Sequence, residues 1–274
     1  MRHNVELAGR TRRGVAFATA GDGPPLVLLH GLGSAHSAWL PVLDRLAASH
    51  TVYAVDLPGF GASERLDGSA AATPRRFAEA VSAALDEWGL DTPHVAGHSL
   101  GAWIALELAG IRPVASLTLL APPGLWRKHQ PLYCAVSLRL TRAACRYTPW
   151  LVTSLSRWAV GRRLLFWQLF AHPERLSPAD VRRDAALMGR GPGFLPAFRA
   201  TRRLRYTASR EVLAPVTLAF GACDRLLLPR QSRHTDQLPR HTRHVVLPDS
   251  GHVPMSDAPE LVAQVVLATT GAAA

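Results

Sequence analysis

The sequence predicts an α/β fold with a mostly parallel, eight-stranded sheet, helices on both faces and an inserted all-helical lid. Over residues 1–124, short apolar segments alternate with helix-like segments, which is typical of repeated βα units and a parallel sheet. The alternation stops over residues 125–210 and resumes over residues 211–274. We therefore expect a first core part, a helical lid and a second core part with these boundaries.

The composition fits this architecture and sets the cellular context. The 274 residues are 48% hydrophobic and 19% charged, which is enough to bury the core of one α/β domain with an insertion. The chain opens with charged residues instead of an apolar segment and cleavage site, so no secretory signal is expected. No stretch reaches the roughly 18 uncharged apolar residues of a spanning helix. These features indicate a cytoplasmic protein, with a peripheral position at a membrane as the alternative.

Eight segments have the character of strands. Residues 5–9 and 14–21 predict a leading hairpin. Continuous apolar character, typical of strands buried on both faces of a parallel sheet, marks several of the others. The six predicted strands after the hairpin are PPLVLLHG (24–31), TVYAVDLPG (51–59), HVAG (94–97), SLTLLAPPG (116–124), APVTLAFG (214–221) and TRHVVLPDSG (242–251).

Helices are expected between these strands. The clearest one begins with Thr73 as the N-cap and Pro74 as the first helical residue, and it ends at Gly89. Three others are predicted over residues 37–49, 99–110 and 258–268. Together with the strands they complete the alternating pattern.

The segment Gly97-His98-Ser99-Leu100-Gly101 stands between a predicted strand and a predicted helix. A serine in such a turn, with glycines on both sides, is held in a strained backbone that exposes its hydroxyl at the edge of the sheet. An inert glycine-rich turn is the alternative. We expect Ser99 to be a nucleophile.

A second glycine-rich turn, His30-Gly31-Leu32-Gly33-Ser34, ends another buried strand. Glycines there let backbone amides approach a substrate oxygen. The amides of Leu32 and Leu100 are the expected donors of an oxyanion hole, unless the segment is an ordinary strand-to-helix turn. We expect four residues around the substrate, with His30 bracing the loop and His98 packing beside the nucleophile: His30, Gly31, Gly33 and His98.

A serine nucleophile needs a base, and the base needs an orienting carboxylate. Asp224 and His252 each follow a predicted strand in the last part of the chain. Asp249 is the rival acid, although a residue so close in sequence turns back onto the imidazole with difficulty. The order Ser99, Asp224, His252 matches one known arrangement of the serine-histidine-aspartate triad.

The chain resembles the α/β-hydrolase fold superfamily, in the branch with a helical cap inserted after the sixth strand. The motifs HGLGS, DLPGFGAS, GHSLG, GACD and SGHVPMSDAPE stand in family order along nearly the whole chain. Some members carry their acid after the sixth strand, but residues 121–124 offer no carboxylate here. Haloalkane dehalogenases and epoxide hydrolases of this superfamily use an aspartate nucleophile, and Ser99 argues against both.

The positive charge of the protein is concentrated in the predicted lid. Residues 125–210 hold 16 arginines and one lysine against three acidic residues, a net charge of +14, whereas the whole chain has a net charge of +11. The same segment is rich in aromatic and aliphatic residues, whose apolar faces are expected to pack on the core and line the roof of a pocket for an apolar substrate. The alternative is contact with an anionic lipid surface or an acidic acyl-carrier protein. Nucleic acid is not an expected partner because no known binding module accompanies the charge.

These observations predict a serine hydrolase for an ester, lactone or thioester of a largely apolar acyl substrate. The same triad also serves acyl transfer, C–C bond hydrolysis and perhydrolysis in the superfamily, and a catalytically silent binding scaffold is a further alternative. The histidines are scattered and no nucleotide-binding glycine motif is present, so we expect no metal and no cofactor. Three cysteines without metal or redox spacing are expected to be buried thiols: Cys134, Cys145 and Cys223.

Overall fold

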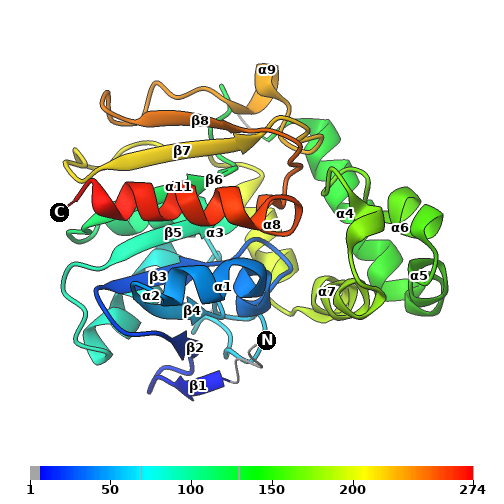
Figure 1. Ribbon diagram of the computed structural model, residues 1–274, viewed down its shortest axis with the longest axis horizontal. Helices are drawn as coiled ribbons and strands as arrows, with labels where there is room; N and C mark the ends of the chain where they lie inside the picture. Colours follow the sequence, from blue (N-terminus) through cyan, green and yellow to red (C-terminus); the bar gives the residue numbers. More distant parts are fainter. Residues whose placement is uncertain (1–6, 69, 129, 274) are drawn as a thin grey trace.

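The computed structural model describes residues 7–68, 70–128 and 130–273. Eight strands of this part of the chain form one sheet in the order β1-β2-β4-β3-β5-β6-β7-β8 (Figure 1). β1 pairs antiparallel with β2 and β2 with β4, and the remaining neighbours are parallel, as the sequence predicts. Val5 and Glu6 of the predicted first strand lie outside the described residues. The strands are β1 (Leu7–Arg10), β2 (Ala16–Ala20), β3 (Pro25–Leu29), β4 (Thr51–Val55), β5 (His94–His98), β6 (Ser116–Leu120), β7 (Val216–Gly221) and β8 (Arg243–Leu247).

Helices cover both faces of the sheet. On one face lie α1 (Leu40–Ala47) and α11 (Pro259–Gly271), and on the other lie α2 (Pro74–Glu87) and α3 (Leu100–Ala109). Successive side chains of a strand point to opposite faces. Accordingly, Leu26 and Leu28 of β3 pack with α1 and α11, whereas Val27 and Leu29 pack with α2 and α3. A buried parallel strand needs this apolar character at every position.

Local signals in the sequence set the ends of these helices. The hydroxyl of Thr73 accepts a hydrogen bond from the Arg76 amide, so Thr73 caps α2 as predicted. The helix predicted over residues 37–49 begins instead with a 3₁₀ turn, η1 (His36–Trp39), before α1. Pro41 lies in the first turn of α1, where its missing N–H leaves no hydrogen bond unmade.

A helical segment is inserted between β6 and β7. It contains α4 (Leu132–Tyr147), α5 (Pro149–Ser156), α6 (Ala159–Phe166), η2 (Pro173–Arg175), α7 (Pro178–Arg190) and α8 (Phe194–Thr201). Two short helices follow later, α9 (Pro229–Ser232) and α10 (Pro254–Asp257). Figure 1 shows α4 to α7 at one end of the molecule, beyond the carboxyl ends of the parallel strands.

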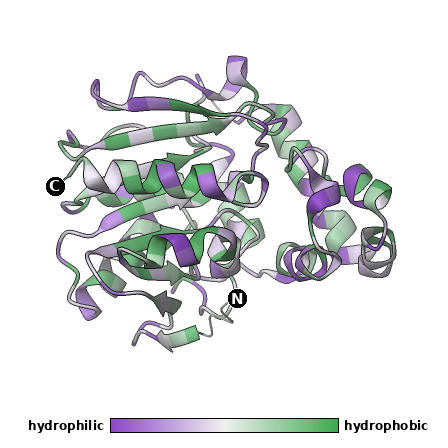
Figure 2. Cartoon of the chain, viewed as in Figure 1, coloured by the Kyte–Doolittle hydropathy of each residue, from purple (hydrophilic) through white to green (hydrophobic). Residues whose placement is uncertain are grey.

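The inserted segment differs from the sheet in its surface chemistry. Hydrophobic residues colour much of the sheet, whereas strongly hydrophilic and hydrophobic residues lie next to each other in the inserted helices (Figure 2). Within the described residues, no helix combines the length and the apolar character needed to cross a membrane. The loops at the carboxyl ends of β3, β5, β7 and β8 meet this segment, and they carry the residues described next.

Candidate active site

Ser99 lies in a sharp turn between β5 and α3. Its φ of 50° and ψ of −120° put it in a region that non-glycine residues rarely adopt. A Cβ on Gly97 would overlap the carbonyl of Gly101, and a Cβ on Gly101 would overlap the carbonyl of Leu29. The Ser99 amide donates to the carbonyl of Leu120 at 2.8 Å, which fixes the turn against β6. Both flanking glycines are therefore required for this close packing.

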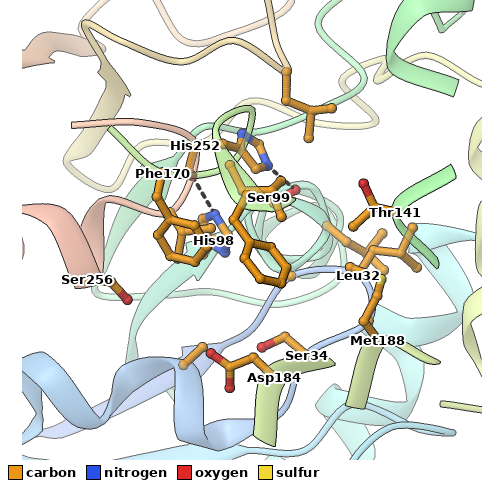
Figure 3. Close-up of a pocket in the computed structure, with 18 of the residues that line it drawn as sticks. Leu32, Ser34, His98, Ser99, Thr141, Phe170, Asp184, Met188, His252 and Ser256 are labelled. Atoms are coloured by element: carbon orange, nitrogen blue, oxygen red, sulfur yellow. Dashed lines mark hydrogen bonds between the residues drawn. The ribbon is translucent and has the colours of Figure 1, made fainter. Parts of the chain in front are cut away.

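Three side chains from separate loops meet above this turn. Nε2 of His252 is 3.0 Å from Oγ of Ser99, and Nδ1 of the same ring is 3.0 Å from Oδ2 of Asp224. His252 is 3% exposed and Asp224 is 5% exposed. Figure 3 shows the rings of His252 and His98 on either side of Ser99. A serine hydroxyl, an imidazole and an orienting carboxylate are therefore hydrogen-bonded in series, as in a catalytic triad.

The environment of Asp224 favours its charged form. Burial acts to raise the pKa of this carboxyl, but the neighbouring His252 and hydrogen bonds from the Leu226 and Leu227 amides outweigh it, and the pKa is lowered. Asp249, the rival acid, is exposed and lies in the turn after β8 with a φ of 50°. Asp224 is thus the carboxylate that contacts the imidazole.

His30 stabilises the glycine-rich turn after β3. Its Nε2 accepts a hydrogen bond from the Leu57 amide at 2.9 Å, so Nδ1 carries the proton and donates to the Gly31 carbonyl at 2.8 Å. Complete burial lowers the pKa of this imidazole to about 4. His30 does not line the cavity described below, which corrects the expectation that it lies against the substrate. Both of its ring nitrogens are used to hold the loop.

His98 holds the loop that carries His252. The Nε2 atom of His98 donates to the backbone carbonyl of His252 at 2.8 Å, and the two ring centroids are 5.2 Å apart. Burial lowers the pKa of His98 to about 3, so its ring is neutral. Its Nδ1 is buried without a hydrogen-bond partner within the described residues. His98 lines the cavity beside Gly31 and Gly33.

The two expected oxyanion donors flank Ser99. Leu100 is the first residue of α3, where the backbone N–H has no acceptor inside the helix. Leu32 lies within the turn that His30 braces, and Leu32 and Leu100 both line the cavity. Among the described residues, neither amide donates a hydrogen bond to the protein. Both N–H groups are therefore available to a ligand.

Two further carboxylates hold these loops, and sequence reasoning missed both. Asp257 accepts hydrogen bonds from the amides of Gly251 (2.8 Å), Ala171 (2.9 Å) and His172 (3.2 Å), so it ties the loop before His252 to the inserted segment. Its place within the SGHVPMSDAPE motif is the signal that could have found it.

Asp56 holds the loop after β4 in the same way, by accepting hydrogen bonds with its carboxylate. Its carboxylate accepts from the amide of His36 at 2.7 Å, from Nδ1 of the same residue at 2.9 Å and from the Ala62 amide at 2.9 Å. A Cβ on Gly61 would overlap this carboxylate, so the glycine of the DLPGFGAS motif makes room for it. Asp56 therefore joins η1 to the loop that follows β4.

A cavity of about 660 Å³ opens above Ser99, between the sheet and the inserted segment. This volume is in the range of pockets that bury a small organic ligand. Most of its wall is apolar, with contributions from Leu32, Leu138, Phe166, Phe170, Met188 and Leu227. Figure 3 shows Phe170 beside His98 and Leu32 on the opposite side of Ser99.

One side of this cavity is polar. Arg183 of α7 pairs with Asp180 at 2.8 Å and with Asp184 at 2.9 Å, and all three side chains line the cavity. Burial raises the pKa of Asp184, although Arg183 opposes the shift. Figure 3 places Asp184 next to Ser34. A ligand would therefore meet apolar side chains near Ser99 and, on the side formed by α7, polar groups.

All three cysteines are free. Cys134 and Cys145 are buried free thiols, and burial raises the pKa of the former to about 12 and of the latter to about 11. Cys223 is free and only half-buried, in contrast to the expectation of complete burial. It stands one residue before Asp224, in the loop that follows β7.

The sequence pattern of the Alpha/beta hydrolase family matches residues 26–265. The protein is a hydrolase enzyme, and the chain belongs to the α/β-hydrolase family, as its motifs predict. It is 31% identical to the dihydrolipoyllysine-residue acetyltransferase component of the acetoin cleaving system of Pseudomonas putida, over 96% of this chain and 68% of that protein. It is also 31% identical to the epoxide hydrolase EphH of Mycobacterium tuberculosis, over 69% of this chain and 91% of that protein.

Among solved structures, the fold is similar to that of a bacterial membrane phospholipase A. The two structures superpose with a TM-score of 0.74 and share 25% sequence identity, over 94% of this chain and 83% of the other. Together with the relatives above, this similarity supports hydrolase or acyl-related chemistry.

Proposed function

We propose that this protein is a serine hydrolase that cleaves an ester, lactone or thioester of a largely apolar acyl compound. One observation carries the proposal: the 3.0 Å contacts from His252 to Ser99 and to Asp224 lie at the base of an apolar cavity. A hydroxyl next to an imidazole that is oriented by a buried carboxylate has the arrangement needed for nucleophilic attack on a carbonyl.

In the proposed acylation step, Nε2 of His252 takes the proton of the Ser99 hydroxyl while Oγ attacks the carbonyl carbon. The amides of Leu32 and Leu100 hold the negative charge that develops on the carbonyl oxygen. Asp224 stabilises the imidazolium through its contact with Nδ1. The imidazolium then gives its proton to the leaving alcohol or thiol, and the acyl group remains on Ser99.

Deacylation repeats these roles with water. His252 takes a proton from the water, whose oxygen attacks the acyl carbon, and the same two amides stabilise the second tetrahedral intermediate. The proton returns to Ser99 as the acid leaves. An acceptor other than water at this step gives acyl transfer instead, and the similarity to an acetyltransferase component makes this the second candidate.

The residues that line the cavity favour a substrate with an apolar acyl group and a polar portion. The apolar side chains lie around Ser99, whereas Arg183 and Asp184 lie on α7. A serine at position 99 favours carbonyl substrates over the epoxides of the relative EphH, because epoxide hydrolases of this superfamily use a carboxylate nucleophile. We also propose that residues 125–210 act as a lid over a core formed by residues 1–124 and 211–274.

The first test is covalent labelling with a fluorophosphonate probe, read by intact-mass spectrometry. Wild-type protein is expected to gain the mass of one probe, and the Ser99→Ala variant is expected to gain none while keeping its circular dichroism spectrum. Ser256→Ala removes another hydroxyl that lines the cavity, so it is the matched control and should label like the wild type. His252→Gln tests the base separately and should label far more slowly. A folded wild-type protein that resists the probe would contradict a working serine nucleophile.

The second test defines the substrate with nitrophenyl esters of increasing acyl length. We expect kcat/KM to rise with chain length until the acyl group fills the apolar part of the cavity. Addition of alcohol or thiol acceptors distinguishes the two candidates. Formation of the transfer product in preference to the free acid would favour the acyltransferase and not the hydrolase.

A further inference from the structure

Large apolar side chains in and directly beside α4, α5 and α6 are exposed to solvent. Leu132, Trp150, Trp158 and Leu164 are each 70% exposed or more. Single exposed apolar residues are common on proteins, but their concentration on three successive helices is not. We call this the outer apolar surface, and define it by Leu132, Leu140, Trp150, Trp158, Leu164 and Trp167.

Helix α4 is apolar on two opposite sides. Its inner side chains Cys134 and Leu138 are buried and line the cavity. Its outer side chains Leu132, Val136 and Leu140 follow one another at the four-residue spacing of a single helix face, and all three are exposed. A helix that faces water on one side normally carries polar residues there. The outer side of α4 therefore has the character of a contact surface.

Arginines surround this surface and acidic residues are missing from its sequence. Arg139, Arg146, Arg157 and Arg163 lie in or beside α4, α5 and α6 and are all exposed. None of the four forms an ion pair with a described residue. No aspartate or glutamate occurs between residues 125 and 173. The segment that carries the surface is thus both apolar and free of acidic side chains, and the nearest acid along the chain is Glu174 of η2 beside α6.

We infer that the outer apolar surface docks onto an anionic phospholipid bilayer. Tryptophan side chains favour the boundary between headgroups and acyl chains, and exposed arginines are attracted to anionic headgroups. A second copy of this chain is a poor occupant, because it would place one set of unpaired arginines against another. An acidic soluble protein would meet the arginines but would not provide an apolar medium for Trp150, Trp158 and Leu164.

A basic hollow continues the surface beyond the start of α4. It has a volume of about 420 Å³, and its wall includes Arg127, Lys128 and Arg230 next to Leu132 and Tyr133. Among the described residues, no acidic side chain lines it. This arrangement places positive charge beside exposed apolar side chains, which is the combination that an anionic headgroup and its acyl chain require.

Docking in this orientation would bring the cavity close to the lipid. Inner side chains of α4 and α6 line the cavity, whereas outer side chains of the same helices form the docking surface. The cavity and the lipid surface are then separated by one helix diameter, about 10 Å. This placement does not depend on the proposed hydrolase chemistry, since it follows from the surface alone.

The test is co-sedimentation of the full chain with two kinds of vesicle: phosphatidylcholine alone, and equal parts of phosphatidylcholine and phosphatidylglycerol. We expect strong binding to the anionic vesicles, which added salt weakens, and weak binding to the neutral ones. Replacement of Arg139, Arg146, Arg157 and Arg163 by Gln should lower the partition coefficient about five-fold for each arginine. Trp150→Ser with Trp158→Ser should lower binding to both kinds of vesicle.

Matched controls lie elsewhere on the surface. Leu213→Ser and Val246→Ser remove apolar side chains that are 81% and 64% exposed outside these helices, and they should leave vesicle binding unchanged. Circular dichroism of every variant checks folding. Equal binding by the control and tryptophan variants, or no binding of folded wild-type protein to anionic vesicles, would overturn the proposal. Preferential capture by a soluble acidic acyl-carrier protein, or self-association through this face in sedimentation velocity, would overturn it as well.

Discussion

The ring of His98 donates its Nε2–H to the backbone carbonyl of His252, at 2.8 Å. The residue that precedes the candidate nucleophile thus holds the loop of the candidate base. The two loops belong to β5 and β8, which lie three strands apart in the sheet, so this contact fixes their relative position across the intervening β6 and β7.

Replacement of His98 should therefore impair turnover more than substrate binding. We expect His98→Ala to lower kcat by on the order of 10–100-fold with a smaller change in KM, because His252 loses its alignment with Ser99. His98→Gln keeps an N–H donor and should recover part of kcat. His94→Gln, at the opposite end of β5, is the matched control. If kcat for an ester substrate is the same in wild type and His98→Ala, the positioning role is wrong.

Two buried histidines make the stability sensitive to acid. Burial lowers the pKa of His30 to about 4 and that of His98 to about 3, whereas both take up a proton near pH 6.5 when unfolded. The unfolded chain therefore binds more protons between these values, and the free energy of unfolding falls as the pH falls from about 6.5 to about 4. The expected loss is on the order of 3 kcal/mol for each ring.

Urea unfolding across this pH range measures the effect. The His98→Gln variant removes one of the two groups, so its free energy of unfolding should depend less steeply on pH than that of the wild type. Equal slopes for the two proteins would mean that His98 is not held neutral by burial.

The two aspartates near His252 should differ sharply in their effect on rate. Asp224→Asn keeps the size of the side chain but removes the charge that orients and stabilises the imidazole, and we expect kcat to fall on the order of 10⁴-fold. Asp249→Asn serves as the control, since Asp249 is exposed, and it should retain the wild-type rate. Steady-state kinetics on one nitrophenyl ester decides this. The reverse pattern would exchange the roles of the two residues.

The turn at Ser99 should tolerate no side chain at its second glycine. A methyl group at position 101 would overlap the carbonyl of Leu29, so Gly101→Ala is expected to destabilise the fold by more than about 3 kcal/mol. Gly271→Ala is the control, because no atom lies within 4 Å of the added carbon, and its effect should stay within about 0.5 kcal/mol. Thermal and urea unfolding compare the two. Wild-type stability of Gly101→Ala would show that the turn can relax.

Loss of the Asp257 carboxylate should loosen the junction between the core and the inserted segment. Three amides, those of Gly251, Ala171 and His172, would lose their acceptor in Asp257→Ala. We expect the free energy of unfolding to fall by about 2–4 kcal/mol. Asp257→Asn retains one acceptor oxygen and should lose less. Limited proteolysis provides the second measurement, with faster cleavage near residue 171 in the alanine variant, and an unchanged digestion pattern would contradict this role.

Local sequence patterns are enough to predict the parallel sheet and the convergence of three side chains at its edge. Ser99, Asp224 and His252 each follow a strand, and the carboxyl ends of parallel strands meet at one edge of a sheet, so their convergence follows from the order of elements. The contacts of Asp257 and Asp56 could not be derived in this way. Their partners are backbone amides, whose positions depend on how distant loops fold.

In the inserted helices, the sequence pattern does not predict which face lines the cavity. Helical periodicity identifies which residues share a face, but both faces of α4 are apolar, so the pattern does not say which face meets the cavity. The same ambiguity affected His30, whose position beside the glycine-rich turn suits either a substrate contact or a brace. Only the direction of the ring, toward the Gly31 carbonyl and the Leu57 amide, distinguishes the two.

The chain leaves the sheet at the end of β6 and returns to it at β7, and these two strands are hydrogen-bonded neighbours, with Leu120 opposite Ala219. Because β6 and β7 are parallel, the chain leaves at the carboxyl edge of the sheet and must return to its amino edge, where Val216 begins β7 opposite Leu117. The inserted helices therefore occupy the place of the crossover that any two neighbouring parallel strands require. A foreign helical segment spliced between the same two strands would change the roof of the cavity and the exposed surface together, as long as it also spans the sheet from its carboxyl edge to its amino edge.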